Sequence, residues 1–208
     1  MRDQEKHHPQ DGGFSRRNFL KGSSALAAAT AISERGTQAD GNASTIPVYG
    51  PEARQVTLTI NGKKQTVEVE PRVSLLSALR DHLDITGAKD ACDSQQVCGS
   101  CTVMIDGKAQ YACGILAVQA EGKEIQTVEG LSDPQPDPVC QAFVQNDAMQ
   151  CGYCTPGMII AVHQILERNP NPSEAEIRNG ISGNFCRCTG YQHIVDAVQY
   201  ASEKIRSK

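Results

Sequence analysis

The chain has 208 residues and a formal net charge of −4, with 39% hydrophobic and 21% charged residues. This balance is typical of a globular protein with one or two small domains. Sparse aromatic residues, no tryptophan and no basic run in the part expected to fold argue against nucleic-acid binding. No apolar run reaches the roughly 18 residues that a membrane span requires, so we expect none.

The N-terminus has the features of an export signal. Arg16 and Arg17 precede Phe19-Leu20-Lys21 and a short alanine-rich region. Such a pair is typical of a signal for the twin-arginine translocation (Tat) route, the alternative being an incidental arginine pair in an amphipathic or disordered N-terminus. We interpret residues 1–45 as a Tat signal peptide and disordered segment. The Tat translocase is then a transient partner and the periplasm the expected destination.

The next stretch predicts a small β domain over residues 54–130. Asn61-Gly62 and Asp106-Gly107 are strong hairpin signals, each between alternating polar and apolar residues. Ser74 can cap a short helix whose leucines recur at helical spacing. A hairpin, a helix, a cysteine-rich loop and further strands are the order of a β-grasp domain. The strands are expected at 55–60, 65–69, 102–105, 109–112 and 124–128.

The pattern turns helical after a proline-dense linker at 131–138. Ser173 and Glu176 form a capping box at the start of one predicted helix. Four short helices around two cysteine pairs predict a small bundle over 139–208, so the fold class is α+β. The helices are expected at 139–146, 158–168, 173–181 and 191–204.

Four of the nine cysteines gather in one stretch, which we call the first quartet: Cys92, Cys98, Cys101 and Cys113. A plant-type 2Fe–2S cluster takes its thiolates from Cys-x4-Cys-x2-Cys and a later fourth cysteine. Here the second gap has the expected two residues, but the first has five. Gly99 lies between two candidate ligands, where the backbone must approach the inorganic core closely.

Four more cysteines form two close pairs, which we call the second quartet: Cys151, Cys154, Cys186 and Cys188. Two groups of four in one small chain predict two 2Fe–2S clusters. Cys140 is left over and is expected to be a buried apolar residue of the first bundle helix.

Other cysteine chemistries fit the spacing less well. Four-cysteine zinc sites usually use two Cys-x2-Cys pairs, whereas Cys186 and Cys188 have a single spacer. A redox dithiol at Cys151 and Cys154 leaves six other cysteines unexplained. Disulfides are expected in an oxidising compartment, but the close pairs suit an ordinary staple framework poorly. The isolated histidines His82, His163 and His193 are interpreted as structural or surface residues, and no catalytic residue is expected on this chain.

At these motifs the chain resembles the iron–sulfur subunit of the molybdenum hydroxylases, a family that includes xanthine dehydrogenase and aldehyde oxidoreductases. The resemblance covers roughly residues 56–205, and with the Tat signal it is strongest to exported bacterial aldehyde oxidoreductases. The motifs that carry it are Gly87-Ala-Lys89, Cys98-Gly-Ser-Cys101-Thr-Val103, Glu129-Gly130-Leu131, Gln150-Cys151-Gly-Tyr-Cys154-Thr-Pro156-Gly157 and Gly183-Asn184-Phe-Cys186-Arg-Cys188-Thr-Gly190-Tyr191.

The resemblance implies a plant-ferredoxin-like domain and a four-helix domain, each with one 2Fe–2S cluster. It implies a large molybdopterin-binding partner subunit and, as electron acceptor, an FAD-binding medium subunit or a cytochrome. Gln150 and Cys188 match family residues that approach the pterin. The substrate, an aldehyde or an N-heteroaromatic compound, would react on the partner and not on this chain. Arg187, between two ligands, either offsets cluster charge or is a solvated surface residue.

The sequence departs from the family pattern in the first quartet. The gap from Cys92 to Cys98 is one residue longer, and Gln96 stands where the family has a glycine. A non-glycine residue in a left-handed conformation is uncommon, so we expect this loop to bulge. A shifted reduction potential or a more labile cluster is the hypothesis that follows.

Two other classes of function remain open on the sequence alone. One is a disulfide- or zinc-stabilised periplasmic interaction module, which would be colourless. The other is a free-standing ferredoxin, which would never capture a large molybdenum subunit.

Overall fold

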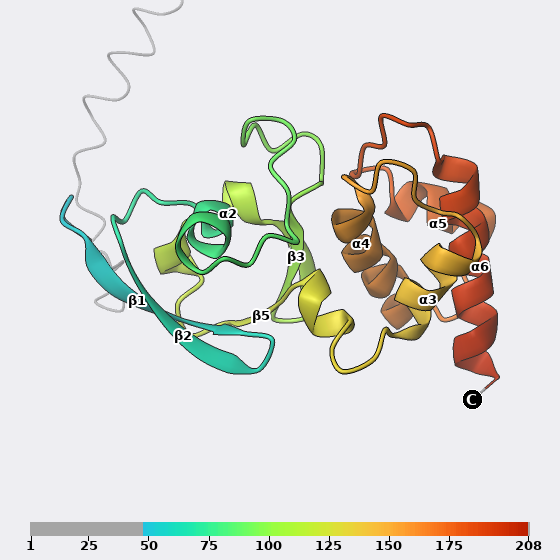
Figure 1. Ribbon diagram of the computed structural model, residues 1–208, viewed down its shortest axis with the longest axis horizontal. Helices are drawn as coiled ribbons and strands as arrows, with labels where there is room; N and C mark the ends of the chain where they lie inside the picture. The colour runs from blue at the N-terminus through green and yellow to red at the C-terminus, as the bar shows by residue number, and fades with distance from the viewer. Residues whose placement is uncertain (1–47, 208) are drawn as a thin grey trace, which may run out of the picture. The chain divides into compact units, whose positions relative to one another are not determined.

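The computed structural model describes residues 48–207 and shows an α+β chain (Figure 1). The predicted Tat signal peptide lies outside these residues. A five-stranded sheet with short helices occupies 54–131, here called the sheet half, and four helices occupy 138–206, here called the helical half. Among the described residues no helix is both long and apolar enough to span a membrane. The expected α+β class is confirmed.

The sheet has the strand order β2-β1-β5-β3-β4, with β4 at one edge. β1 runs antiparallel to β2 and parallel to β5, and β3 runs antiparallel to both β4 and β5. The parallel pairing of the first and last strands requires the chain between them to cross over the sheet. The strands are β1 Arg54–Ile60, β2 Lys63–Val69, β3 Thr102–Ile105, β4 Lys108–Tyr111 and β5 Glu124–Gln126.

Two tight hairpins set the register of the sheet. Asn61 (φ 50°) and Gly62 (φ 74°) join β1 to β2, and Asp106 (φ 48°) and Gly107 (φ 72°) join β3 to β4. Positive φ at both central residues is the type I′ geometry that matches strand twist, which is why these dipeptides predicted the hairpins.

A short helical segment covers the sheet between β2 and the first quartet. The Ser74 hydroxyl accepts a hydrogen bond from the Ser77 N–H (3.2 Å) and begins α2 (Leu75–Ser77). The predicted helix then continues as a π-helical turn, Ala78–His82. Leu75 and Leu79 are fully buried against the inner face of the sheet. This segment completes the core of the sheet half.

The helical half is built from α3 (Pro138–Gln145), α4 (Thr155–Arg168), α5 (Glu174–Gly180) and α6 (Tyr191–Arg206). Asp137 caps α3 through the Cys140 N–H (2.8 Å), and the predicted capping box at Ser173 and Glu176 begins α5. The helices bury a core of their own, in which the largest fully buried side chains are Phe143, Met158, Ile160, Ile177 and Ile194.

Strand β3 belongs to both cores. All four of its residues are buried. Val103 and Ile105 pack into the core of the sheet half, whereas Met104 packs into the core of the helical half. Since side chains alternate between the faces of a strand, α4 packs on the face of β3 opposite to the one that α2 and the π-helical turn cover. The two halves are therefore joined by buried apolar contact as well as by the chain.

Candidate metal centres

The four sulfurs of the first quartet form two close pairs. Cys101 Sγ and Cys113 Sγ lie 3.4 Å apart, and the Cys92 and Cys98 side chains are within hydrogen-bonding reach of one another. Cys98 is also close enough to Cys101 for their charges to interact. The structure thus brings all four predicted residues of this quartet together.

The lengthened loop of the first quartet uses left-handed backbone at non-glycine residues. Asp93 (φ 54°), Ser94 (φ 56°) and Gln96 (φ 59°) all have positive φ. Gln96 therefore adopts the left-handed conformation that glycine favours. Asp90 stabilises this loop, because its carboxylate oxygens accept hydrogen bonds from the Ser94 N–H and hydroxyl (2.9 Å each). Such an Asp–Ser turn makes left-handed residues tolerable.

The second quartet is assembled from two distant segments. Cys151 and Cys188 are in hydrogen-bonding reach, as are Cys154 and Cys186. Cys154 immediately precedes α4, and Cys186 and Cys188 lie on the loop before α6. The Gly190 N–H points at Cys186 Sγ (3.4 Å). Packing of α4 against the loop before α6 therefore builds this site.

Each quartet contains one thiol whose pKa is raised by burial and one whose pKa is lowered by backbone hydrogen bonds. Burial raises the pKa of Cys101 and of Cys154 to about 12. Backbone N–H groups that donate to the sulfur lower the pKa of Cys92 and of Cys151. A buried thiol binds as thiolate only when a cation supplies compensating charge, and a coordinating thiol is deprotonated by the metal. The quartets are suited to a cationic centre.

The paired sulfurs do not converge on a single point. Within residues 48–207 no three His, Cys, Asp or Glu side chains are arranged to hold one metal ion. A 2Fe–2S cluster has two irons and takes two protein ligands on each. The pairs Cys92/Cys98 and Cys101/Cys113, and likewise the two pairs of the second quartet, therefore fit a binuclear cluster better than one tetrahedral zinc ion.

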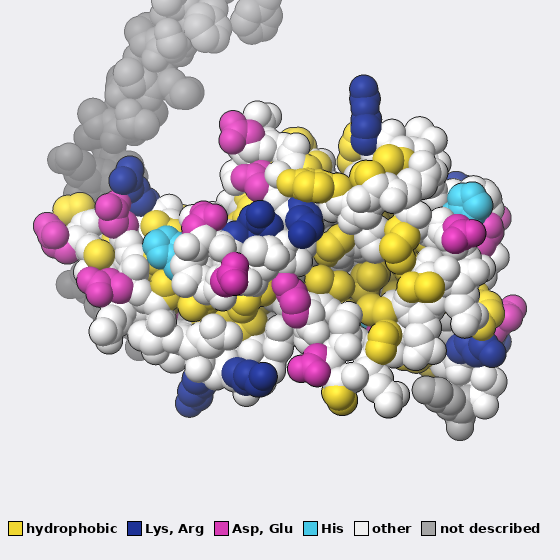
Figure 2. Space-filling view, in the orientation of Figure 1, with side chains coloured by type: hydrophobic (Ala, Val, Ile, Leu, Met, Phe, Trp, Pro, Cys, Tyr) yellow, Lys and Arg dark blue, Asp and Glu magenta, His cyan; other side chains and the backbone are white. Residues whose placement is uncertain are grey.

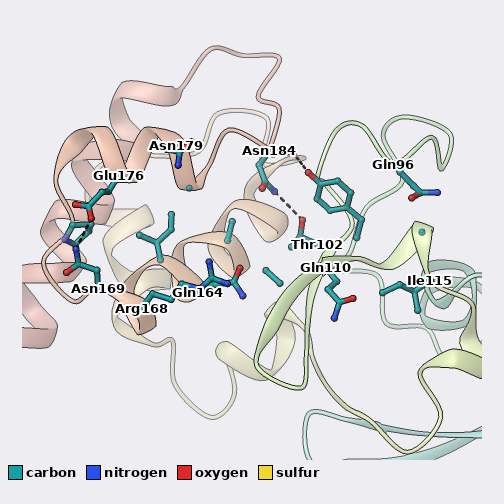
Figure 3. A pocket seen from close by; sticks show the side chains of 18 residues that line it. Gln96, Thr102, Gln110, Ile115, Gln164, Arg168, Asn169, Glu176, Asn179 and Asn184 are labelled. Atoms are coloured by element: carbon teal, nitrogen blue, oxygen red, sulfur yellow. Dashed lines mark hydrogen bonds between the residues drawn. The ribbon is translucent and has the colours of Figure 1, made fainter.

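The loops that carry the two quartets contact each other directly. The Phe185 N–H donates to the Cys98 carbonyl (2.8 Å), and the Asn184 amide donates to the Gly99 carbonyl (2.9 Å). Asn184 also reaches the Thr102 hydroxyl (3.3 Å), as Figure 3 shows. Phe185 and Asn184 directly precede Cys186 in the sequence, so each quartet is fixed in position against the other.

This close approach requires glycine at two of the motif positions. Gly99 has a φ of +71°, and a Cβ there would collide with the Gly183 carbonyl and the Asn184 amide. A Cβ at Gly157, in the first turn of α4, would collide with the Gly99 carbonyl. Any side chain at either position would separate the two loops.

A groove of about 650 Å³ lies beside this junction, between strand β4 and helices α4 and α5. Figure 3 shows Gln110, Gln164 and Arg168 around it. None of its lining residues is a cysteine. It is separate from the cysteine sites.

Two family-motif residues to which sequence reasoning assigned no role are structural. The Glu129 carboxylate accepts hydrogen bonds from the Gly87 N–H (2.7 Å) and the Thr127 hydroxyl (2.6 Å). Asn61 in turn donates to that hydroxyl and accepts from the Thr127 N–H. The network fixes the chain entering the first quartet. The periodicity of the sequence gives no signal for it, since its members lie in three separate segments.

The remaining predicted residues lie as follows. Gln150 is exposed, and its amide lies beside Gly190, next to the second quartet. Cys140 is 8% exposed within the helical core, as expected. His163 pairs with Asp137 and ties α4 to the start of α3, which is a structural role. His82, Arg187 and His193 are exposed.

Comparison with known families identifies the class of protein. Residues 58–145 match the 2Fe-2S iron-sulfur cluster binding domain family, and residues 127–199 match the 2Fe-2S binding domain family. Residues 13–33 match the twin-arginine translocation signal, so Tat export to the periplasm is confirmed. The fold and sites therefore define an exported iron–sulfur protein of the electron-transfer class.

Relatives of similar length identify the particular family. The chain is 38% identical over 218 residues to the aldehyde oxidoreductase iron-sulfur-binding subunit PaoA of Escherichia coli K12, covering 97% of this chain and 94% of PaoA. It is 43% identical to the nicotine 6-hydroxylase small subunit of Paenarthrobacter nicotinovorans, covering 74% and 93%. The crystal structure of quinoline 2-oxidoreductase from Pseudomonas putida 86 matches with a TM-score of 0.71 and 46% identity, covering 75% and 98%. The chain belongs to the iron–sulfur subunits of the molybdenum hydroxylases.

Proposed function

We propose that the chain carries two 2Fe–2S clusters, one in each half, and relays electrons for an exported molybdenum hydroxylase. Cys92, Cys98, Cys101 and Cys113 ligate one cluster in a ferredoxin-like domain, residues 54–130. Cys151, Cys154, Cys186 and Cys188 ligate the other in a four-helix domain, residues 139–208. The observation that carries the proposal is the arrangement of each quartet as two pairs of sulfurs.

When bound, each cluster accepts and donates one electron at a time. The residues of this chain hold it and tune it. Backbone N–H groups directed at Cys92, Cys151 and Cys186 favour the negative charge of a reduced cluster. The direct contact between the loops keeps the two centres at a fixed separation, which a relay needs.

The relatives suggest the chemistry of the complex, since their names refer to aldehydes, nicotine and quinoline. We infer that a large molybdopterin-binding subunit oxidises an aldehyde or an N-heteroaromatic compound. Electrons then leave to an FAD-binding subunit or a cytochrome. Gln150 and Cys188 would face the molybdopterin, in keeping with the exposure of Gln150 and its place beside the second quartet.

The surface near the quartets supports a role in a complex. Three exposed apolar residues lie next to predicted ligands in the sequence: Val97 (67% exposed), Tyr153 (46%) and Phe185 (54%). Figure 2 shows apolar side chains, which there include cysteine, gathered over the helical half and the junction, while charges of both signs are scattered over the sheet half. Apolar surface of this kind is typical of a protein–protein contact.

The experiment is to purify the full chain from cells that also produce candidate large and medium subunits. We expect a red-brown complex whose small subunit contains iron and acid-labile sulfide, with two distinct EPR signals after reduction with dithionite. A colourless protein whose cysteines are bridged to each other or hold zinc would contradict the proposal. A coloured chain that never captures a large subunit would identify a free-standing ferredoxin instead.

A further inference from the structure

Cys92 lies in the least regular segment of the first quartet, where its carbonyl accepts a hydrogen bond from the Gln95 N–H (3.3 Å). Cys98 is held by the hydrogen bond to Phe185, Cys101 directly precedes β3, and Cys113 lies in a helical turn. Cys92 belongs to no helix or strand, and the segment after it contains the left-handed residues Asp93, Ser94 and Gln96. A position of this kind needs support from outside its own segment if it is to present a ligand reproducibly.

Two supports for this segment meet at Asp90. Its carboxylate closes the turn by accepting from the Ser94 N–H and hydroxyl (2.9 Å each). Its backbone carbonyl accepts a hydrogen bond from the Tyr153 hydroxyl (2.9 Å). Tyr153 comes from the other quartet, between Cys151 and Cys154, so the second support reaches across from the helical half.

We propose that Tyr153 is a positioning residue for Cys92 and acts through Asp90. The phenol fixes the Asp90 carbonyl, the Asp90 carboxylate fixes Ser94, and Cys92 lies between these two anchored residues. The extra residue of the loop is tolerated because Tyr153 immobilises the chain at Asp90, just before the lengthened loop begins. This inference rests on the proposed function, in which Cys92 ligates a 2Fe–2S cluster.

A second tyrosine provides a matched control. Tyr111, at the end of β4, also donates its hydroxyl across the junction, to the Gly183 carbonyl (2.6 Å). It lies beside Cys113 and supports the segment that leads to Cys186. Each substitution, Tyr153→Phe or Tyr111→Phe, removes one phenolic oxygen and one hydrogen bond between the halves, but the two bonds hold different segments.

The test is the rate at which a strong iron chelator removes iron from the purified complex. The two clusters are told apart by EPR, with Cys98→Ser and Cys154→Ser each assigning one signal. We expect Tyr153→Phe to speed loss of the first-quartet signal by about 2–10-fold, the factor by which one ordinary hydrogen bond shifts an opening equilibrium. In Tyr153→Phe the second-quartet signal should decay at the wild-type rate, whereas Tyr111→Phe, which frees the Gly183 carbonyl ahead of Cys186, should speed loss of the second-quartet signal more than that of the first.

Several results would overturn the proposal: wild-type release from Tyr153→Phe, equal acceleration at both clusters, or acceleration at the second quartet alone. Asp90→Ala provides an independent measurement if Tyr153→Phe does not load. It should accelerate release from the same cluster, and the double variant should show less than the product of the two effects, because both act on one segment. Multiplicative effects would also overturn it. If the wild-type protein binds no iron, the proposed function fails. If the wild type binds iron but Tyr153→Phe releases it at the wild-type rate, only this inference fails.

Discussion

The two quartets solve the same problem in opposite ways. The first comes from one short stretch, residues 92–113, and most of its geometry is set by local backbone, including three left-handed non-glycine residues. Hydrogen bonds from Tyr153 and Phe185 add support from the helical half. The second joins segments separated by α4 and α5, and its geometry comes from helix packing. The first site should therefore be sensitive to changes in its loop, and the second to the stability of the helical half.

The largest effect should come from removing one proposed ligand at each site. Cys101→Ser should halve the iron content and remove one EPR signal, and Cys154→Ser should remove the other. Cys101 is buried and Cys154 is half-buried, and burial raises the pKa of each thiol to about 12. A serine hydroxyl is a much weaker ligand than the thiolate that a metal centre would stabilise there. Iron analysis and EPR of the two purified variants check this. Retention of both signals in either variant would contradict the ligand assignment.

A smaller but still large effect is expected at the contact between the loops. Gly99→Ala adds a Cβ that collides with the Gly183 carbonyl and the Asn184 amide, so it should destabilise the chain by about 2–4 kcal/mol from overpacking and left-handed strain together. Gly62→Ala is the matched control. Its φ of +74° is similar, but a Cβ there has no neighbour within 4 Å.

Gly62→Ala should therefore show only the backbone cost of about 1 kcal/mol. Chemical denaturation of the full chain measures both variants. Equal losses at the two positions would show that the loops are not in close contact.

The helical half can be weakened without touching a cysteine of either quartet. Burial favours the neutral form of Asp137, but hydrogen bonds from His163 and the Cys140 N–H outweigh this, so its pKa lies below the usual value. A depressed folded-state pKa means that the carboxylate stabilises the fold above its unfolded pKa, and that this stability is lost as pH falls through the folded pKa.

Asp137→Ala should accordingly cost about 0.5–2 kcal/mol at pH 7, the usual cost of losing a helix cap. The difference between wild type and variant should start to shrink as pH falls below about 4 and should be lost as pH falls through the depressed folded-state pKa. Far-UV circular dichroism during denaturation at each pH measures it, with the exposed Asp133→Ala as control. The second-quartet EPR signal should broaden or decline before the first. A loss confined to the first-quartet signal would show that the first quartet, and not the second, depends on the stability of the helical half.

The smallest effect is expected at Arg187. It is exposed between two proposed ligands, Cys186 and Cys188, and forms no ion pair with any described residue. Loss of its charge should lower the midpoint potential of the second cluster by no more than about 40 mV, because a unit charge 4 Å away in water is worth about 1 kcal/mol. Spectroelectrochemical titration of Arg187→Ala measures the shift. A change at the first cluster would show that the charge acts elsewhere.

Much of this architecture could be predicted from the sequence because its signals are local. Asn61-Gly62 and Asp106-Gly107 specified both hairpins, and the Ser173 capping box specified the start of α5. The cysteine spacing divided eight sulfurs into the two groups that the structure brings together. The departure at Gln96, where the family has a glycine, drew attention to this loop, and the structure places Gln96 in left-handed backbone.

The features that sequence reasoning missed depend on contacts between distant segments. The bond from Glu129 to Gly87 and that from Tyr153 to Asp90 each join residues far apart in the chain. The parallel pairing of β1 with β5 is equally non-local. The π-helical turn at Ala78–His82 was also missed, since leucine spacing alone does not distinguish it from an α-helix.

Because strand β3 contributes side chains to both cores, the sheet half and the helical half are difficult to separate. Met104 is 5% exposed because the helices cover it, while its neighbours on the strand face the opposite core. Cutting the chain in the proline-rich stretch at 131–138 and separating the fragments would expose the face of β3 that carries Met104. Each fragment would then have apolar surface exposed to solvent. A fusion of this electron-transfer unit to another oxidoreductase would therefore have to include residues 54–206 as one continuous segment.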